Sequence, residues 1–268
     1  MTVPRQPGSS PPSNVLLLSH PRSGSSWLGS TMANSPIVDY RREPVLQHRI
    51  GKVSDAFGAS SGLTPEERDD LQTEVTAAFA DRESPTVVVK EVTPLLVDDF
   101  LQAADPQVVY LRRHPLAVAE SHLALGWLPH RRLLDRAGIG AREREMLQSL
   151  WDSGSDAAKL VAYFAAVESS VRDRLERAGA ITVTYEDLRA GDIGDAARLF
   201  DSLGIGTSDL SAPSVDGERT DAYGVGESRK LTSVDVPTPE ALEEVKEAWL
   251  AFSPTSYRNE ADWTLGTA

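Results

Sequence analysis

The residues with the clearest chemical potential follow a short apolar run near the start of the chain. Residues 15–18 (VLLL) form the run, and residues 19–28 (SHPRSGSSWL) come directly after it. Where a buried strand turns sharply into a helix, several unpaired backbone N–H groups and the positive end of the helix dipole point at one place. Gly24 lets the backbone approach an anion closely, Arg22 adds positive charge, and the two serines after the glycine add hydroxyl donors. The pattern predicts a phosphate-binding loop; the plainer alternative is an ordinary strand-to-helix turn with serine as the N-cap.

A second apolar run, residues 108–111 (VVYL), also leads into polar residues. Arg113 follows it, Pro115 stands where a helix begins, and Ser121 comes eight residues after the arginine. An arginine at a strand end and a serine two turns into the next helix can clamp one phosphate by charge-assisted hydrogen bonds. Taken singly, the arginine could simply form a surface ion pair, and the serine could simply present its hydroxyl to solvent. As a spaced pair in a chain that also carries the first loop, they indicate a second phosphate site.

The first loop differs from that of nucleoside triphosphatases, because the pattern GxxxxGK[ST] is absent and no Lys-Ser/Thr pair stands at the turn. It resembles the 5′-phosphosulfate-binding loop of sulfotransferases that use 3′-phosphoadenosine-5′-phosphosulfate (PAPS). The family pattern, P-[KR]-S-G-[ST]-[ST]-x-[LV], is matched at every fixed position by residues 21–28. The family's second motif, an apolar strand, Arg-x-Pro and a serine eight residues after the arginine, is matched by residues 108–121.

The resemblance implies a role for each matching residue. It assigns Arg22 to the bridging oxygen and the sulfuryl group, as negative charge builds on the leaving phosphate, and residues 23–26 to the 5′-phosphate. It places Trp27 against the adenine, with Tyr185 nearby, in a fragment (VTYEDL) similar to the family's Y-E-D-[LM]. The cofactor-binding residues that it implies are Arg22, Ser23, Gly24, Ser25, Ser26, Trp27, Arg113, Ser121, Tyr185, Arg229 and Lys230. The last two resemble a late Arg-Lys-Gly loop that closes on the 3′-phosphate, although Leu231 replaces its glycine.

Sulfuryl transfer to an alcohol requires a base near the acceptor hydroxyl. Aryl and steroid sulfotransferases take it from a histidine in Lys-Thr-His after a central strand, but this chain has KEV at residues 90–92. The carbohydrate and tyrosylprotein branches use a glutamate, often in Tyr-x-x-Glu-Pro, about twenty residues after the loop arginine. Residues 40–44 (YRREP) match that context and put Glu43 twenty-one residues after Arg22. The resemblance therefore implies a carbohydrate/tyrosylprotein-type enzyme with Glu43 as the general base.

Alternatives for the catalytic residues remain. A partly desolvated Glu43 would have a raised pKa, which helps it to accept a proton, but it could instead form a salt bridge with Arg41 or Arg42. Glu91 is the second candidate base. Lys90, at the carboxyl end of a strand, is expected to reach the transferring sulfuryl oxygens, with an ordinary exposed lysine as the alternative.

The elements that must position these residues can be read from apolar patterning and capping signals. Strands are predicted at residues 15–18, 37–40, 86–90, 108–111 and 181–185, and the loop leads into a helix at 27–34. A capping box with proline at the first helical position starts a helix at Thr64 that runs to about residue 81. Apolar residues spaced along 160–175 share one face of a helix, and Gly179 ends that helix. Thr238 starts a last helix. Strands that alternate with helices predict an α/β fold of three α/β/α layers with a mainly parallel sheet, like that of P-loop proteins.

Residues 1–13 are rich in proline, serine and glycine, and predict a disordered tail before a single domain at 14–268. Two stretches, residues 41–62 and 126–154, fit the core pattern poorly. We expect them to form caps over the carboxyl edge of the sheet, where ligands bind in such folds. Solvent-exposed helices are an equal alternative for the second stretch.

Composition narrows the function classes. The chain has 268 residues, 40 of them acidic and 27 basic, for a formal net charge of −13, and no cysteine. The acidic balance argues against nucleic acid as a partner, and the lack of cysteine excludes disulfides, thiolate metal sites and cysteine nucleophiles. The five histidines show no metal-ligand spacing, so no metal is predicted; His20 and His114 are expected to support the phosphate loops rather than act as bases. Without an apolar run long enough for a membrane anchor, a soluble cytoplasmic protein is predicted.

Together these features predict a PAPS-dependent sulfotransferase that acts on a hydroxyl of a small molecule, a sugar or a secondary metabolite, and releases 3′-phosphoadenosine-5′-phosphate (PAP). One alternative is a P-loop kinase or nucleotide hydrolase, although the loop lysine and an acidic magnesium ligand after a strand are missing. The other is a non-catalytic nucleotide-binding protein of the same fold.

Overall fold

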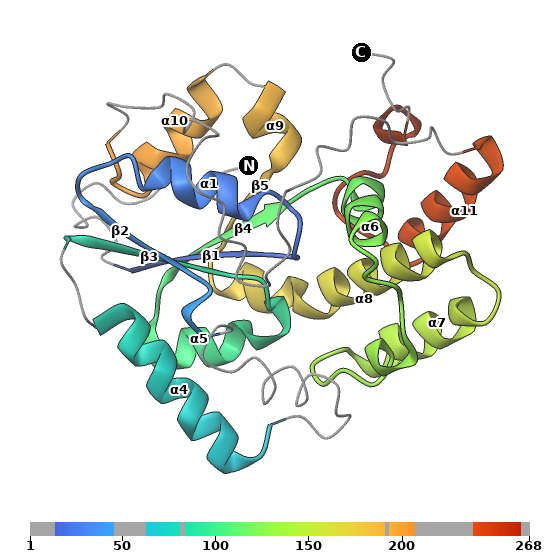
Figure 1. Ribbon diagram of the computed structural model, residues 1–268, viewed down its shortest axis with the longest axis horizontal. Helices are drawn as coiled ribbons and strands as arrows, with labels where there is room; N and C mark the ends of the chain where they lie inside the picture. Colours follow the sequence, from blue (N-terminus) through green and yellow to red (C-terminus); the bar gives the residue numbers. More distant parts are fainter. Residues whose placement is uncertain (1–13, 46–62, 81–83, 191–192, 207–237, 264–268) are drawn as a thin grey trace.

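A five-stranded, all-parallel sheet forms the centre of the computed structural model, which describes residues 14–45, 63–80, 84–190, 193–206 and 238–263 (Figure 1). The strands are β1 (Asn14–Ser19), β2 (Val38–Arg42), β3 (Thr86–Glu91), β4 (Gln107–Arg112) and β5 (Ile181–Thr184). Their order is β2-β3-β1-β4-β5. The predicted α/β class and parallel sheet are confirmed, and each predicted strand is found within two residues of its expected bounds.

Strand β1 holds the central position, because it pairs with β3 on one side and with β4 on the other. From β1 the chain builds β2 and β3 on one side of the sheet and then β4 and β5 on the other. The order reverses beside β1, and in open α/β sheets such a reversal leaves a crevice at the carboxyl ends of the strands. The segments that follow β1 and β4, residues 20–27 and 113–121, contain most of the predicted site residues, and both start at this edge.

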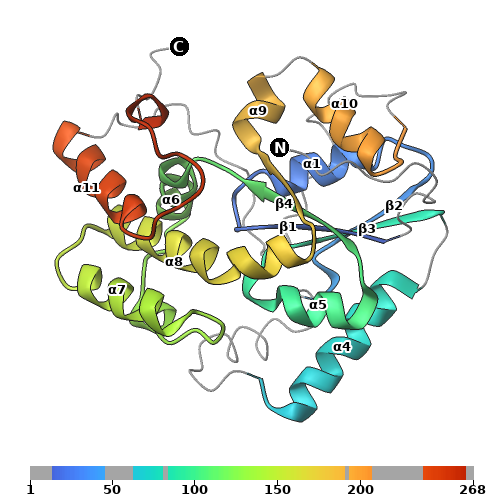
Figure 2. The same ribbon diagram turned by 180° about the vertical axis from the view of Figure 1, so that it is seen from behind.

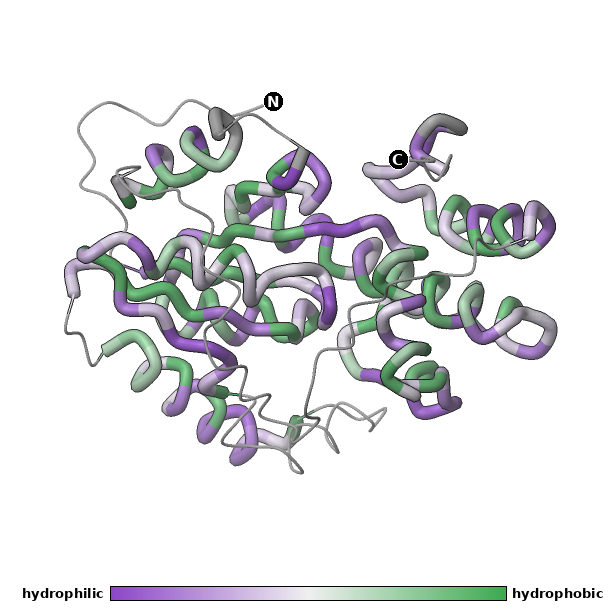
Figure 3. The backbone as a smooth tube through the Cα atoms, turned by 45° about the horizontal axis from the view of Figure 1, so that its top comes forward, coloured by the Kyte–Doolittle hydropathy of each residue, from purple (hydrophilic) through white to green (hydrophobic). Residues whose placement is uncertain are grey.

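Helices cover both faces of the sheet (Figures 1 and 2). One face carries α4 (Pro65–Ala80), α5 (Val97–Ala104) and α8 (Asp156–Arg177), and the other carries α1 (Ser25–Met32), α9 (Tyr185–Ala190) and α10 (Ile193–Ser202). Alternate residues of β1 enter the two cores: Leu16 and Leu18 the first, Val15 and Leu17 the second. In Figure 3 the hydrophobic stretches gather in the central strands, whereas the surrounding helices alternate between hydrophobic and hydrophilic residues.

A third group of helices lies beyond the carboxyl edge, where the 22-residue helix α8 extends past the sheet (Figure 1). It consists of α6 (Pro115–Ala124), α7 (Ala141–Trp151) and α11 (Pro239–Leu250), all packed on α8, with the short 3₁₀ turns η1 (Pro94–Leu96), η2 (Arg131–Leu133) and η3 (Glu260–Trp263). Two N-caps set the starts of the long helices: the side chains of Ser155 and Thr238 accept hydrogen bonds from Ala158 N–H and Ala241 N–H. Helix α8 thus connects the sheet to the elements around the candidate site.

Local signals predicted several boundaries correctly. Thr64 and Glu67 form the expected capping box, in which each side chain bonds the other's backbone N–H. Gly179, at a φ of 62°, follows the end of α8 as predicted. One boundary was wrong: Tyr185 was placed in the fifth strand, but β5 ends at Thr184 and Tyr185 begins α9. The predicted tail, residues 46–62 of the first cap, Arg229 and Lys230 lie outside the described residues. Within the described ranges, no helix combines the length and apolarity that crossing a bilayer requires.

We predict that Leu17→Ala lowers the free energy of unfolding by about 2–5 kcal/mol, because it leaves a cavity at a fully buried position of the central strand β1. Chemical denaturation followed by circular dichroism measures this loss. Leu128, which is 58% exposed, provides the matched control: Leu128→Ala should change stability by no more than about 0.5 kcal/mol. Equal losses for the two variants would contradict the burial assigned to β1.

Candidate active site

The loop between β1 and α1 has the geometry of an anion cradle. Helix α1 begins at Ser25 after Gly24, whose φ of 90° is left-handed. Arg22 is also left-handed, with a φ of 68°, so the loop turns twice within three residues. The N-cap is Gly24, and in the described part of the chain no side chain caps the first turn of α1. The simple serine-capped turn is therefore not what forms here, and the first N–H groups of α1 point to a place where an anion can bind.

The second motif lies directly against this loop. Arg22 Nε donates a hydrogen bond to Ser121 Oγ at 2.9 Å, and Arg113 Nη1 donates to the Arg22 carbonyl oxygen at 3.0 Å. The two motifs, about ninety residues apart in the sequence, thus meet at one corner of the sheet. Two guanidinium groups of like charge at one corner repel each other, and a bound anion removes that repulsion.

Aromatic side chains form the next wall of the corner. Tyr185 packs so closely on Gly24 that a Cβ added to the glycine would lie 2.4 Å from the tyrosine ring. Trp27 meets Tyr185 edge to face at 5.8 Å between ring centroids, and the Arg113 guanidinium lies 4.8 Å from the centroid of the Tyr185 ring. Arg189 lies 5.5 Å from the centroid of the Trp27 ring. Every described residue of the predicted cofactor set therefore lies in this loop or against it.

The Glu186 carboxylate, which the sequence analysis did not identify, supports the second motif through hydrogen bonds. Glu186 accepts one hydrogen bond from His114 N–H at 2.9 Å and another from the Tyr257 hydroxyl at 2.7 Å. The His114 ring packs edge-on against Tyr257 and Trp263, at 5.0 and 4.7 Å between ring centroids. Burial lowers the pKa of His114. The C-terminal segment thus holds the residue next to Arg113, and the position of Glu186 directly after Tyr185 was the sequence signal that could have revealed this contact.

The predicted base and the predicted lysine form a buried ion pair. Glu43 follows the last residue of β2 with a φ of 50° and donates its backbone N–H to the Lys90 carbonyl oxygen at 2.7 Å. Its carboxylate pairs with Lys90 Nζ, and both side chains are less than one-tenth exposed. The alternative partner Arg41 instead pairs with Asp39 at 2.6 Å. Burial lowers the pKa of Lys90, and the neighbouring Glu43 carboxylate opposes that shift.

Glu91, the second candidate base, lies at the same strand end. It is fully buried, and its carboxylate accepts the Val45 N–H at 2.9 Å. Both candidate carboxyl groups therefore make hydrogen bonds that hold the chain at the ends of β2 and β3.

A pocket of about 270 Å³ lies beside the anion-binding loop. It is lined by two residues of the loop, by residues that follow β3, by one residue of α6, by residues 127–136 of the second predicted cap, and by α8. Its lining residues are His20, Pro21, Val92, Thr93, Pro94, Leu95, His122, Trp127, Leu128, His130, Leu133, Arg136, Leu160, Tyr163, Phe164 and Val167. Nothing in the sequence indicated that His20 and His122 share a cavity, because one follows β1 and the other lies in α6.

Comparison with known proteins supports the fold. Neither a protein family nor a curated protein matches the sequence. Among solved structures, the chain is similar to a sulfotransferase from Alicyclobacillus acidocaldarius, with a TM-score of 0.51, 15% identity and coverage of 91% of this chain and 93% of that one. It is also similar to the mouse sulfotransferase SULT7A1 complexed with PAP, with a TM-score of 0.50, 12% identity and coverage of 93% and 87%.

The chain has the sulfotransferase fold. At these identities the likeness extends to the architecture alone. The residues of the anion-binding corner and of the pocket must therefore carry the functional argument by their own geometry.

We predict that Glu43→Gln lowers the free energy of unfolding by about 3–5 kcal/mol at pH 7, because it leaves the Lys90 charge buried without its partner. Without the carboxylate, burial lowers the pKa of Lys90 further. The unfolded chain then binds more protons than the folded one at pH values between that lowered pKa and the ordinary value of 10.5. The stability of the variant therefore rises with pH across this window.

Chemical denaturation of the variant at pH 7 and at about pH 10 tests this rise in stability with pH. Asp39→Asn, which breaks the more exposed pair with Arg41, is the control and should cost less than about 1 kcal/mol at either pH. A Glu43→Gln variant as stable as Asp39→Asn would contradict the buried pair.

Proposed function

We propose that this protein is a sulfotransferase that moves the sulfuryl group of PAPS to the hydroxyl of a small-molecule acceptor. The observation that carries the proposal is the meeting of the two motifs, in which Arg22 contacts both Ser121 and Arg113 at the N-terminus of α1. A donor with phosphates at both its 5′ and 3′ positions requires such a paired site. The PAP-complexed mouse sulfotransferase of the same fold supports this choice of donor.

The residues at this corner fit the donor in charge and in shape. The N–H groups at the start of α1, with Ser25 and Ser26, suit the 5′-phosphate. Arg113 and Ser121 suit the 3′-phosphate, since guanidinium and hydroxyl groups donate hydrogen bonds and carry the charge that phosphate requires. When bound, PAPS supplies a sulfuryl group already attached to a good leaving group. Arg22 then stabilises the charge that builds on the leaving phosphate.

The adenine is assigned to the aromatic wall. Trp27 and Tyr185 meet edge to face, and aromatic rings of this kind can pack against a purine. Arg229 and Lys230 remain assigned to closure on the 3′-phosphate by resemblance alone.

The proton acceptor predicted from the sequence is Glu43, with Glu91 as the second candidate, and this stays a prediction. Lys90 is proposed to act beside Glu43, near the transferring oxygens. Both carboxyl groups are buried at strand ends, and neither belongs to the described lining of the pocket next to the donor loop. The predicted carbohydrate-type branch depends on this glutamate and is part of the same proposal. So are the predicted acceptors, a sugar or a secondary metabolite, and the predicted location in the cytoplasm.

We predict that the wild-type protein binds PAP more tightly than ATP, with or without magnesium, and that Arg113→Gln weakens PAP binding at least tenfold. The reason is the loss of charge-assisted hydrogen bonds to the 3′-phosphate, each of which contributes about 1.5–3 kcal/mol. Isothermal titration calorimetry gives the dissociation constants. Arg131→Gln is the control, because Arg131 is 74% exposed and pairs only at the surface with Asp152. A preference for magnesium–ATP would instead identify a kinase or nucleotide hydrolase.

We also predict that Gly24→Ala weakens PAP binding at least tenfold. The methyl group of the alanine would clash with the Tyr185 ring, and the alanine backbone would have to adopt a φ of 90°. The loop must therefore shift. Gly179→Ala is a matched control, because Gly179 also has a positive φ, of 62°, but no atom lies within 4 Å of the added carbon. Gly179→Ala should lose about 1 kcal/mol of stability because of its positive φ, and Gly24→Ala should lose more because of the additional clash with Tyr185. Equal PAP affinities in the two variants would argue against the loop as the donor site.

A further inference from the structure

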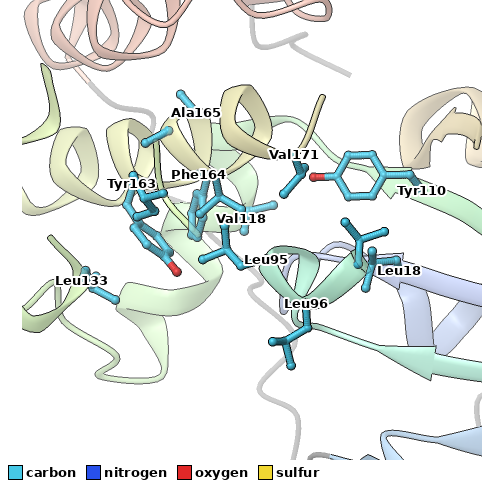
Figure 4. Close-up of a cluster of buried hydrophobic side chains, with 14 of the residues drawn as sticks. Leu18, Leu95, Leu96, Tyr110, Val118, Leu133, Tyr163, Phe164, Ala165 and Val171 are labelled. Carbon is cyan, nitrogen blue, oxygen red and sulfur yellow. The ribbon is translucent and has the colours of Figure 1, made fainter. Parts of the chain in front are cut away.

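The pocket beside the donor loop is lined mainly by apolar side chains. Figure 4 shows Tyr163 and Phe164 on α8, with Leu133 and Leu95 near them, and these four residues line the pocket. Among the described residues, the large apolar side chains that are exposed are Trp127 and Leu128, at 36% and 58%, and both belong to the same lining. Exposed apolar residues at the rim of an apolar cavity mark a binding site for an apolar molecule.

The polar groups of the pocket are mostly histidine rings. His20, His122 and His130 line it, together with Arg136 and Thr93, and no carboxylate of the described residues does so. His20 directly precedes the Pro-Arg of the donor loop, and His122 directly follows Ser121, which bonds to Arg22. The side of the pocket formed by His20 and His122 is therefore the side nearest the arginine assigned to the sulfuryl group.

The hydrogen bonding of His122 defines its chemistry. Its Nδ1 lies 2.8 Å from the Val118 carbonyl oxygen, one turn back in α6. A carbonyl can only accept, so Nδ1 carries a proton, and in the neutral ring Nε2 carries the lone pair. Trp127 and Phe164 pack against the ring at 5.2 Å each between centroids, which holds its orientation. Since Nδ1 is bonded to the helix and the residue lines the pocket, Nε2 is the ring nitrogen left for a bound molecule.

The environment keeps these rings neutral before reaction. Burial lowers the pKa of His122, and the nearby Arg22 lowers it as well, against the opposing effect of the Val118 carbonyl. Burial, with His122, Arg112 and Arg136, lowers the pKa of His20 to about 3. His20 is only 7% exposed, and its Nε2 has no hydrogen-bond partner among the described residues. A buried polar atom without a partner at a cavity wall is satisfied when a ligand bonds to it.

We propose that His122 accepts the proton of the acceptor hydroxyl, and that the pocket it lines takes an uncharged, mainly apolar alcohol or phenol with a hydrogen bond to His20. This inference rests on the proposed sulfuryl transfer from PAPS. In the step, the acceptor oxygen forms a bond to sulfur while the O–H bond breaks, and the proton passes to Nε2 of His122. The bond between sulfur and the 5′-phosphate oxygen breaks, and its electron pair leaves with PAP.

The charge changes in this step suit the site. His122 becomes positive as it takes the proton, and the phosphates held by Arg22 and its neighbours supply compensating negative charge. The charged group that acts on the pKa of His122 is Arg22, and the neighbouring titratable ring that interacts with it is His20. Bound PAP should therefore raise the pKa of His122, since a nearby anion favours the charged imidazole.

The test uses the whole protein labelled with 15N-histidine and two variants, His122→Asn and His130→Asn. In His122→Asn the amide can still donate to the Val118 carbonyl, but the lone pair of Nε2 is gone. We expect kcat with 4-methylphenol or cyclohexanol as acceptor to fall at least a hundredfold, because a positioned base contributes about 10²–10⁴-fold, with the dissociation constant of PAP unchanged within about threefold. The acidic limb of kcat/KM in the wild type should be lost in this variant. His130→Asn, a change elsewhere in the pocket lining, should alter KM and keep that limb.

Nuclear magnetic resonance of the wild type provides a readout without turnover. The neutral His122 ring should be the Nδ1–H tautomer. The pKa of His122 should rise when PAP is added. In the PAP complex, 4-methylphenol should shift the Nε2 resonance of His122. This measurement keeps the inference testable if His122→Asn does not fold.

The outcomes separate the two proposals. Normal PAP binding with full turnover in His122→Asn would overturn the role of His122 and leave the sulfotransferase intact. Turnover of glucose but of neither apolar probe, with no shift at His122, would overturn the acceptor class. Failure of the wild type to bind PAP would overturn the proposed function and the inference with it.

Discussion

The contact between the two phosphate motifs is the constraint on which the rest of the site depends. Arg22 donates to Ser121, and Arg113 donates to the Arg22 carbonyl oxygen, so the loop after β1 and the loop after β4 hold each other in place. Both loops extend from neighbouring parallel strands, whose carboxyl ends necessarily meet at one edge of the sheet. The arrangement concentrates positive charge and helix N–H groups in a protein whose formal net charge is −13. A local basic site in an acidic chain favours a small anionic ligand over an extended polyanion.

Helix α8 links this corner to the pocket. Its sheet-facing residues belong to the main core, and its far part carries Tyr163 and Phe164 into the pocket (Figure 4). It also supports α6, which contributes Ser121 to the donor corner and His122 to the pocket. Adjacent residues of one helix, pointing in directions about 100° apart, thereby serve the two halves of the proposed reaction. A rigid shared scaffold of this kind holds donor and acceptor in register, which is the main requirement of in-line group transfer.

The buried acids and the buried His122 differ in how many of their polar atoms are held by internal partners. The carboxylates of Glu43 and Glu91 each have an internal partner, Lys90 Nζ and Val45 N–H respectively, and these contacts hold the strand ends together. The ring of His122 is bonded at one nitrogen only by the backbone of its own helix, which fixes the tautomer and directs the other nitrogen outward. The same loss of solvent that strengthens the attraction within an ion pair keeps the imidazole neutral, so that a lone pair is available to accept a proton.

Sequence alone determined the parts of this protein that depend on neighbours along the chain. The β-strands, the capping box at Thr64 and the turn of the loop after β1 follow from apolar runs, hydrogen-bonding side chains and the conformational freedom of Gly24, all of which act over a few residues. The resemblance to sulfotransferases also identified the described residues that the structure brings to the donor corner. Only the tertiary structure decided that Glu43 pairs with Lys90, that Glu186 bonds both His114 and Tyr257, and that His20 and His122 share a pocket. These contacts join residues between 47 and 102 positions apart, and they depend on strand order and helix packing, which no local pattern encodes.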